Sequence, residues 1–391
     1  MMIPLMKNTF LHESDTKKAL SDFILRTERL SMGSECLAFE KQFAAYQNSR
    51  EAVLFNSGGS ANLALIQSLK NLNFLKDGSK VGFSALTWST NVMPIIQMNM
   101  IPVPVDVDVR TLNVMSDTLL ERLESDTLDA LFLTNALGFT GDLPQIRKIC
   151  KEQDIILIED NCESLGTELP SGKAGNFGFA ATFSFFVAHH MSTIEGGLVA
   201  TNNRELAEML RIVRANGWDR NLDAVQQTTL RTRFGIENEF DAKYTFYDLG
   251  YNLRPTEITG FLGQYQLQFL EENIKIRENN YQILEQEVQG NTELITPEHA
   301  HITRLSSFAF PVICRTSAIR EKYIARFSSS NIEVRPMIAG NIQRQPFYSK
   351  YVRNIYDLPS TEFIHKCGFY CGNYPELSDE DLETVRSCIK K

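Results

Sequence analysis

The stretch "FSFFVAHHMSTIEGG", residues 183–197, holds the side chains best suited to proton transfer. His189 and His190 stand together in it, and a glutamate followed by two glycines closes it. The ordinary pKa of histidine lies close to neutral pH, so its imidazole is a good general base or acid. The stretch contains no lysine, the residue that binds carbonyl groups covalently as a Schiff base. The pair therefore favours proton transfer without covalent attachment.

Three upstream motifs carry groups suited to an anionic aromatic ligand. "NSGGSANLALI" places Gly59 and Ser60 just before an amphipathic helix, where free backbone N–H groups favour an anion. Trp88 follows an apolar strand and offers a flat face for stacking. Asp160 ends the strand "IILIED", where a carboxylate can keep a ring nitrogen protonated. Each motif also has a purely structural interpretation: a helix cap, core packing and a turn cap, respectively.

The elements that must position these groups alternate between strands and helices. Short apolar runs predict strands at 80–86, 101–108, 129–136 and 154–160. Helical spacing of apolar residues predicts helices at 61–70, 116–123 and 143–152. Fully apolar strands between helices indicate an α/β fold with a mostly parallel sheet covered on both faces. Ligands of such sheets bind at the carboxyl ends of the strands.

After about residue 255 the pattern changes. A helix at 257–277 leads into a longer one that reaches 288, followed by strands at 307–314 and 332–337, a helix near 317–329 and a final helix from Ser378. We therefore expect a large α/β ligand-binding domain over 15–255 and a smaller C-terminal α+β domain over 256–391. Residues 1–14 are expected to pack on the small domain or on a partner subunit.

Composition excludes some classes of partner. The chain of 391 residues is 43% hydrophobic and 22% charged, with a formal net charge of −9, so nothing indicates binding to nucleic acid or to an anionic membrane. We find no secretory signal and no apolar run long enough to span a bilayer. The seven scattered cysteines indicate free thiols in a reducing cytoplasm, and the close pair Cys367 and Cys371 lacks a second pair at zinc-ligand spacing.

The order of these motifs resembles that of the DegT/DnrJ/EryC1/StrS sugar aminotransferases, which have the fold of aspartate aminotransferase (fold type I). The resemblance runs from "SMGSECLAFEKQFAAY" through "EDNCESLG", "HHMSTIEGG" and "NGWDRN" to "LGYNLRPTEITGFLG" and "VRPMIAGN". Within that family the chain is most similar to the dehydratase branch, whose members act on GDP-linked 4-keto-6-deoxymannose on the route to colitose in the O-antigen of lipopolysaccharide.

The resemblance implies a site for pyridoxal or pyridoxamine 5'-phosphate. Its implied members are Gly59, Ser60 and Ser184 at the phosphate, Trp88 stacked on the ring, Asp160 at the ring nitrogen and Glu163 at the ring's hydroxyl edge. Asn252 would reach the phosphate of the partner subunit, which makes a homodimer the expected working unit.

The resemblance also places His189 where an aminotransferase has its lysine. Histidine retains proton transfer but not covalent anchoring, so the cofactor is expected as non-covalent pyridoxamine phosphate. The implied reaction is loss of the C3 hydroxyl from a nucleotide-linked 4-keto-6-deoxy sugar, with glutamate as amino donor and ammonia released. No iron–sulfur cluster is expected, because no cysteine lies between 163 and 313.

Three other interpretations of the histidine pair stay open. A metal site is disfavoured because no further ligand motif accompanies the pair, and no metal is expected. A non-catalytic binding protein, and a conventional 4-aminotransferase that uses another lysine, are the other two. Lys173 lies before the loop, and no other lysine is near it.

The sugar and its nucleotide are less determined. Arg220, Arg254 and Arg335 lie in motifs that resemble the lining of a nucleotide-sugar cleft, and guanidinium groups match diphosphate oxygens. A structural role is the alternative for each of them. Residues 222–246 and 342–350 depart from the family pattern, so GDP-4-keto-6-deoxymannose is the default substrate, and a different 4-keto sugar, such as a heptose, stays open.

Overall fold

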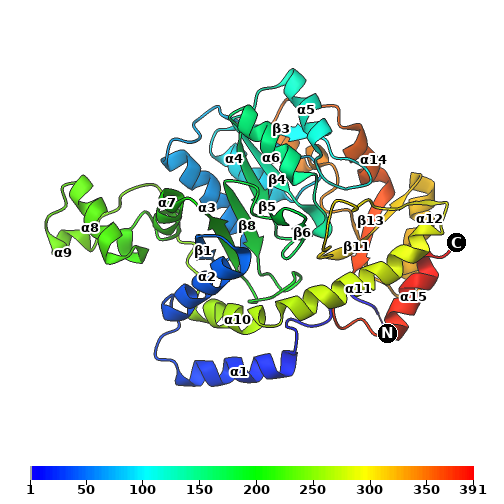
Figure 1. Cartoon of the computed structure of the whole chain (residues 1–391), viewed down its shortest axis with the longest axis horizontal. Coiled ribbons are helices and arrows are strands. Elements are labelled where there is room, and N and C mark those ends of the chain that lie inside the picture. Colours follow the sequence, from blue (N-terminus) through cyan, green and yellow to red (C-terminus); the bar gives the residue numbers. More distant parts are fainter. Residues whose placement is uncertain (1) are drawn as a thin grey trace.

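A computed structural model describes residues 2–391, and its centre is a seven-stranded sheet (Figure 1). The strand order is β1-β9-β8-β5-β4-β2-β3, and all neighbours from β8 to β3 are parallel. Only β9 runs antiparallel to both of its neighbours. The strands are β1 (Glu51–Phe55), β2 (Lys80–Ser84), β3 (Ile101–Val105), β4 (Ala130–Thr134), β5 (Ile156–Asp160), β8 (Ala180–Ser184) and β9 (Gly197–Thr201). The four predicted strands of this sheet are confirmed.

Helices cover both faces of this sheet because successive strand residues point to opposite sides. Phe132 and Ile158 pack in one core cluster with α3 (Gly58–Asn71) and α7 (Arg204–Arg214). Leu131 and Leu157 belong to the core on the opposite side, beside α5 (Ser116–Ser125) and α6 (Leu143–Glu152). A third cluster joins α2 (Ser34–Gln47) to β1, β8 and β9. The three predicted helices, at 61–70, 116–123 and 143–152, correspond to α3, α5 and α6.

A four-stranded antiparallel sheet of order β10-β11-β13-β12 forms the second layer of strands. Its strands are β10 (Leu294–Ile295), β11 (Ala309–Cys314), β12 (Val334–Pro336) and β13 (Gly368–Gly372). Its helices are α11 (Leu270–Gln289), α12 (Ser317–Ser329), α14 (Pro359–Cys367) and α15 (Asp379–Ile389). This sheet shares a hydrophobic core with α5 and α6, and the predicted domain boundary at 255/256 stays a prediction.

The predicted junction between the two helices after residue 256 is wrong. The break lies at Gln268 and Phe269, between α10 (Glu257–Leu267) and α11, rather than near Arg277. No proline or glycine marks this break. It allows α10 to pack on α1 (Glu13–Arg26) and α2 while α11 packs on α15, so tertiary contacts explain the position of the break.

The remaining elements connect these layers. They are α4 (Met93–Gln97), α8 (Ala224–Arg233), α9 (Glu239–Ala242), α13 (Pro346–Tyr351) and the hairpin of β6 (Glu168–Leu169) with β7 (Gly172–Lys173). Helices α8 and α9 form an arm that projects from the body of the molecule (Figure 1). Within residues 2–391, no helix combines the length and the apolar character that a membrane crossing requires.

Candidate active site

A cavity of about 320 Å³ lies at the carboxyl ends of the parallel strands, and we call it the main cavity. Thr134, Asp160 and Ser184 end β4, β5 and β8, and all three side chains line it. Phe308 and Tyr370, beside and within the second sheet, line the opposite wall. The main cavity is therefore the place where strand ends of the large sheet meet the smaller sheet.

The N-terminus of α3 forms one wall of the main cavity. Ser57 caps this helix, because its Oγ accepts a hydrogen bond from the Ser60 N–H at 3.1 Å. Gly58 has no room for a side chain: a Cβ there would lie 2.7 Å from the Ser184 Cβ. A Cβ on Gly59 would lie 3.1 Å from Thr90 Cγ2. Backbone N–H groups and the Ser184 hydroxyl thus approach one spot closely, which suits a phosphate group.

Asp160 is held by neutral donors at the floor of the main cavity and is 4% exposed. Its Oδ2 accepts hydrogen bonds from Asn91 Nδ2 at 2.7 Å and from Asn62 Nδ2 at 3.0 Å. Its Oδ1 accepts one from the Cys162 N–H at 2.9 Å. None of these donors is charged, so a cationic ring nitrogen of a ligand can still pair with this carboxyl group.

Glu163 follows Asp160 at the same cavity wall, where its Oε2 accepts a hydrogen bond from the Leu137 N–H at 2.9 Å. Burial raises the pKa of Glu163 to about 7; the Leu137 N–H opposes this rise, and the Asp160 charge adds to it. Leu137 itself has a φ of 57°, a left-handed conformation that is strained for a leucine. Glu163 is therefore poised to donate or accept a hydrogen bond near neutral pH.

His189 lines the main cavity from the loop between β8 and β9. Its backbone N–H donates to the Phe186 carbonyl at 2.9 Å, and its ring lies 5.2 Å from that of Phe308. Burial, together with the positive charge of Arg277, lowers the pKa of His189 to about 4. The imidazole is consequently neutral at physiological pH and can accept a proton.

The loop of His189 is fixed at both ends beside the N-terminus of α3. Ser184 pairs with Gly197 where β8 and β9 meet, and a Cβ on Gly197 would lie 2.2 Å from the Ser57 carbonyl oxygen. Within the loop, Ile194 has a φ of 71°, which a β-branched side chain rarely adopts. The backbone of the loop that carries His189 is therefore tightly constrained.

Trp88 marks the opening of the main cavity and is 58% exposed. It follows β2 and precedes Asn91, so the same short segment supplies an aromatic face and a hydrogen bond to Asp160. Phe186, on the facing loop, is 42% exposed. A flat ligand entering here would meet apolar surface before it reached the buried carboxylate.

The structure brings together six of the predicted site residues around the main cavity: Gly59, Trp88, Asp160, Glu163, Ser184 and His189. Ser60 lies in the first turn of α3, where its Oγ accepts a hydrogen bond from the Ser57 hydroxyl at 2.9 Å, and it does not line the cavity. Its predicted phosphate contact stays a prediction.

The four other predicted residues lie outside the lining of the main cavity. Asn252 Oδ1 accepts a hydrogen bond from Arg254 Nε at 3.1 Å. The Arg220 guanidinium lies 4.3 Å from the Trp218 ring centroid. Arg335 on β12 pairs in register with Tyr370 on β13, so it stands next to the cavity wall. Substrate contacts by the three arginines, and a contact of Asn252 with a partner subunit, stay predictions.

Several lining or supporting residues escaped the sequence analysis. Asn62 and Asn91, which hold Asp160, carried a signal, since each lies within three residues of a motif position. Phe308, Ile338 and Tyr370 carried none. They come from three separate segments, two beside the second sheet and one within it, and only the tertiary fold brings them to the cavity.

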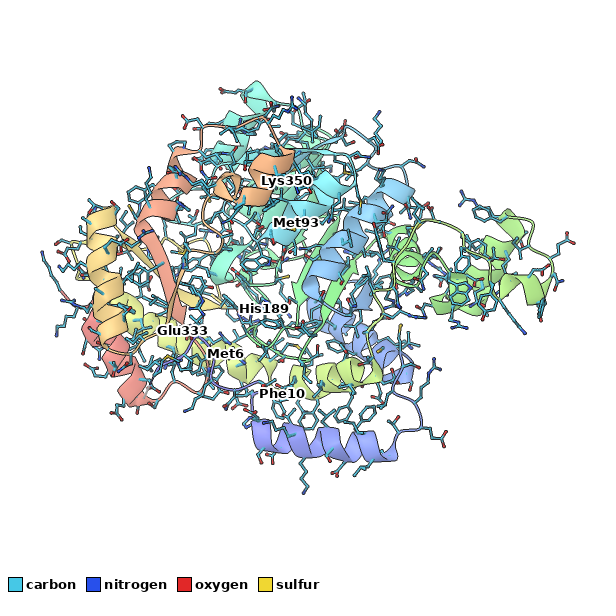
Figure 2. All side chains as sticks on the ribbon, turned by 180° about the vertical axis from the view of Figure 1, so that it is seen from behind. Met6, Phe10, Met93, His189, Glu333 and Lys350 are labelled. Carbon is cyan, nitrogen blue, oxygen red and sulfur yellow. The ribbon has the colours of Figure 1, made fainter. Side chains whose placement is uncertain are left out.

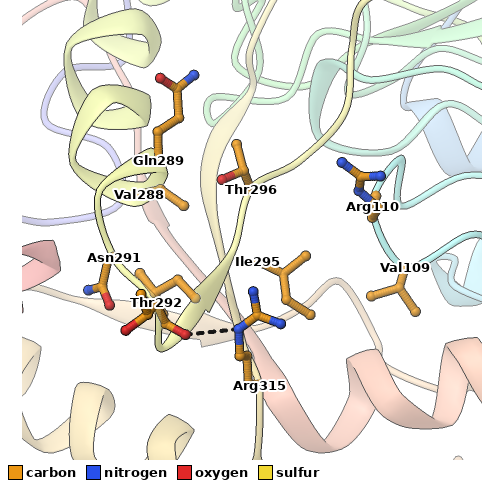
Figure 3. A pocket seen from close by; sticks show the side chains of 10 residues that line it. Val109, Arg110, Val288, Gln289, Asn291, Thr292, Ile295, Thr296 and Arg315 are labelled. Carbon is orange, nitrogen blue, oxygen red and sulfur yellow. Dashed lines mark hydrogen bonds between the residues drawn. The ribbon is translucent and has the colours of Figure 1, made fainter.

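A larger cavity of about 490 Å³ lies elsewhere, between the end of α11 and the segment around Arg110 (Figure 3). Arg315 lines it and donates a hydrogen bond to the Thr292 carbonyl at 2.8 Å. No histidine, cysteine or carboxylate is among the described residues of its lining. The groups capable of acid–base chemistry thus gather at the main cavity.

The main cavity fits pyridoxamine phosphate in three respects. Its volume lies within the roughly 300–1,000 Å³ typical of small-molecule sites. The two glycines at the start of α3 leave space that a Cβ would fill, beside the Ser184 hydroxyl. The Asp160 carboxyl group also lines the cavity, where it can pair with a pyridine nitrogen.

Comparisons with known proteins agree with this geometry. Residues 12–390 match the family model described as the DegT/DnrJ/EryC1/StrS aminotransferase family. Over 376 residues the chain is 33% identical to a GDP-4-keto-6-deoxy-D-mannose 3-dehydratase of Escherichia coli, covering 94% of this chain and 95% of that relative.

Two solved structures of GDP-4-keto-6-deoxymannose-3-dehydratase are also similar. One, a variant with bound GDP-perosamine, superposes with a TM-score of 0.91 at 30% identity over 99% of this chain and 100% of that chain. The other, with a trapped PLP–glutamate geminal diamine, superposes with a TM-score of 0.90 at 31% identity and the same two coverages. The predicted aspartate aminotransferase-like fold is thereby confirmed.

Proposed function

Because the chain belongs to the DegT/DnrJ/EryC1/StrS aminotransferase family, we propose that it is a pyridoxamine phosphate-dependent 3-dehydratase of a nucleotide-linked sugar. Its substrate is GDP-4-keto-6-deoxymannose, as in the similar dehydratases. The product is the corresponding 3-deoxy-4-keto sugar. Glutamate supplies the amino group and the two electrons that the loss of the C3 hydroxyl requires, and it becomes 2-oxoglutarate. The hydroxyl leaves as water, and hydrolysis of the product imine releases ammonia.

One observation carries this proposal: an imidazole, and not an amine, faces the main cavity. His189 lines the cavity together with Asp160 and Glu163, and no lysine is among the described residues of that lining. Lys173, which lies in β7, instead donates a hydrogen bond to the Tyr46 carbonyl at 2.6 Å. The cavity lining therefore includes a group for proton transfer, but no amine that could bind the cofactor covalently.

The bound cofactor supplies a ring that accepts the electrons displaced during elimination. Asp160 would pair with the ring nitrogen, since its own hydrogen bonds come from neutral donors. Ser184 and the N–H groups at the start of α3 would hold the phosphate, and Trp88 would supply an aromatic face for the ring. These four contacts fix the orientation in which proton transfer takes place.

His189 moves the proton. Its neutral imidazole accepts a proton at a ring nitrogen, and the resulting imidazolium then donates it to the departing C3 hydroxyl. Because burial and Arg277 disfavour the charged form, the imidazolium is a strong acid in this site. Glu163, whose pKa is raised to about 7, exchanges a hydrogen bond with the ring's hydroxyl edge in either protonation state.

The rest of the site includes residues outside the main cavity. Arg220, Arg254 and Arg335 bind the diphosphate or sugar of the substrate, because guanidinium pairs bidentately with phosphate oxygens. The active form is a homodimer in which Asn252 reaches the phosphate site of the partner subunit. An exposed position of Asn252 at the surface of one subunit supports this arrangement.

Product analysis tests the proposal. The chain is incubated with GDP-4-keto-6-deoxymannose, pyridoxamine phosphate and glutamate, and the products are identified by mass spectrometry. A 3-deoxy-4-keto sugar with ammonia is expected, and other 4-keto nucleotide sugars, including a heptose, are run in parallel. A 4-amino sugar would show a 4-aminotransferase instead, and cofactor binding without turnover of any substrate would show a binding protein.

Borohydride reduction in the presence of pyridoxal phosphate, the aldehyde form of the cofactor, tests the role of His189 separately. The unmodified chain is expected to give no reduced cofactor–lysine adduct, because no lysine lines the main cavity. His189→Lys is expected to give that adduct and to lose dehydration by at least about 100-fold, the low end of what one general base contributes. An adduct in the unmodified chain, or retained dehydration in the variant, would contradict the assignment.

A further inference from the structure

A second, small cavity lies behind His189, on the side away from the main cavity's opening. This rear cavity measures about 10 Å³, the space of about one water molecule. Its polar lining consists chiefly of Asn8, His189, His190, Asn273, Arg277 and Glu376. Met6 and Phe10 close it from the N-terminal segment, which Figure 2 shows just below His189.

Four residues of this lining carry buried polar atoms without hydrogen-bond partners among residues 2–391. They are Nδ1 of His189, Nδ1 of His190, Nη2 of Arg277 and Oε2 of Glu376. Nε2 of His190 donates to the Ser306 carbonyl at 3.0 Å, so Nδ1 of the neutral ring is an acceptor. These donors and acceptors thus surround a space that holds one water molecule. Such a water can supply the hydrogen bonds that buried polar atoms require.

Arg277 brings a buried positive charge to this place. It is 1% exposed, and its partners are neutral: Asn273 Oδ1 at 2.6 Å, the Phe308 carbonyl at 2.8 Å and the Asn373 carbonyl. No carboxylate forms an ion pair with it within the described part of the chain. A buried charge of this kind acts strongly on its neighbours, because solvent screens it little.

The segment Ser306–Phe308 fixes Arg277 relative to the histidines. Its first carbonyl accepts the hydrogen bond of His190, and its last accepts that of Arg277. The Phe308 ring packs 5.2 Å from the ring of His189. The guanidinium and the two imidazoles are therefore held by one short stretch of backbone.

Among the other charged and titratable groups around His189, Glu376 acts on Arg277: its charge raises the pKa of the guanidinium, although no ion pair joins the two among the described residues. Asp160, Cys162, Glu163, Glu195 and Tyr370 face the main cavity, and His190 and Glu376 face the rear one. The N-terminal segment adds none to the rear lining. Among all of these, burial and Arg277 are the influences that lower the pKa of His189, and Arg277 also lowers that of His190.

We propose that Arg277 is a positioning residue for the reaction: acting across the one-water rear cavity, it holds His189 as the neutral imidazole that accepts protons. This rests on the proposed function of His189. The water accepts a hydrogen bond from the guanidinium and donates one to His190 Nδ1. Protonation of His189 would then bring a second positive charge beside Arg277, and their repulsion drives the proton onward to the substrate.

Histidine titration followed by NMR tests this without turnover. The full chain, labelled with ¹⁵N-histidine and saturated with pyridoxamine phosphate, is titrated, and the His189 signal is assigned from its loss in His189→Gln. We expect His189 to stay neutral down to about pH 5, since its pKa is lowered to about 4. Asn273→Asp keeps the shape and the hydrogen bond to Arg277 but cancels its charge, so the midpoint should rise by at least about one pH unit.

Matched variants make the outcome decisive. Arg277→Gln should raise the midpoint as Asn273→Asp does, whereas Arg277→Lys should keep it low. Asn279→Asp makes the same change at an exposed position on the same helix and should leave the midpoint in place. A wild-type midpoint at or above 6.5, or an unmoved midpoint in a folded Asn273→Asp or Arg277→Gln, overturns the proposal.

The titration separates this proposal from the proposed function. If the midpoint moves as expected but no 3-deoxy sugar forms, the electrostatic role of Arg277 stands and the assigned reaction fails. If dehydration occurs but the midpoint does not move, the reaction stands and the role of Arg277 fails.

Discussion

Two titratable groups with oppositely shifted pKa values flank the main cavity. Burial raises the pKa of Glu163 to about 7 and lowers that of His189 to about 4. Near pH 7 the imidazole is therefore neutral, and the carboxyl group is close to half protonated. Groups whose environments separate their pKa values in this way commonly divide acid and base roles between them. We assign the base to His189, while Glu163 adjusts its hydrogen bond to the ligand.

The raised pKa of Glu163 has a measurable consequence for stability. A carboxyl group whose folded pKa lies above its unfolded value binds more protons in the folded chain, so the free energy of unfolding falls as pH rises from about 4.5 to about 7. Glu163→Gln removes the titrating carboxyl group, and with it this loss of stability at higher pH. Between pH 5 and pH 8, the variant should gain about 2 kcal/mol relative to the unmodified chain.

Denaturant unfolding of the cofactor-free protein at the two pH values measures this difference. His189 and other shifted groups change both proteins equally, so the comparison isolates Glu163. The same difference between variant and unmodified chain at pH 5 and at pH 8 would show that Glu163 titrates with an ordinary pKa in the folded chain.

Some site residues could be predicted because their signal is local. Asp160 ends a run of apolar residues, and a carboxylate at that position needs only the strand to be placed correctly. His189 stands in a loop whose flanking motifs fix its role. Arg277, in contrast, lies in the polar sequence "NIKIRENN", which is typical of a solvated helix face. Its burial follows from the way α11 packs beneath the loop of His189.

At the scale of elements, one carboxylate connects two helices, α10 and α2. Glu257 stands in the first turn of α10 and is 4% exposed. Its side chain accepts hydrogen bonds from the N–H groups of Gly33 at 2.7 Å, Glu35 at 3.0 Å and Cys36 at 3.2 Å. It therefore caps the N-terminus of α2, which has no side-chain cap of its own.

Removal of this cap should cost about 3 kcal/mol in the free energy of unfolding. Glu257→Ala leaves three N–H groups without acceptors, one of them buried and two partly buried, and each carries a desolvation penalty. Glu257→Gln should cost less, because its amide oxygen still accepts. Glu380→Ala, at an exposed position in the first turn of α15, should stay within about 0.5 kcal/mol. Equal losses in Glu257→Ala and Glu380→Ala, measured by denaturant unfolding, would contradict the capping role.

The predictability of elements follows the same distinction between local and tertiary causes. The predicted strands β2 to β5 and their helices were recovered because each is apolar or amphipathic over its own length. The break at Gln268–Phe269 was misplaced since no local residue causes it. Strand β13, "GFYCG", was not predicted: glycines at both ends weaken the pattern, and its pairing partners β11 and β12 lie far away in the sequence.

At the scale of the whole molecule, apolar side chains gather at and near the projecting arm. Val225, Phe240, Tyr244 and Leu249 are each at least 70% exposed. Exposed apolar groups of this density commonly mark a surface that another protein covers. They support the proposed homodimer, in which the segment that follows the arm carries Asn252.

Subunit mixing tests whether Asn252 serves the partner's site. His189→Asn and Asn252→Ala chains are each expected to be inactive, but hybrid dimers of the two should recover up to about half the activity per hybrid. One of their sites then has both residues intact. Light scattering first measures the mass of each purified protein, 44.4 kDa for a monomer. If Asn252 acts within its own subunit, both sites of the hybrid are defective and no activity returns.

The loop between β8 and β9, which is fixed at both ends, has a consequence for how the chemistry of this fold can change in evolution. Its two ends, Ser184 and Gly197, are held against the start of α3, so the proposed phosphate contacts do not depend on which side chain stands at position 189. The proposed binding and proton-transfer groups thus lie on separate short stretches of the sequence. A substitution at position 189 would therefore change the group that transfers protons and leave the proposed phosphate site in place.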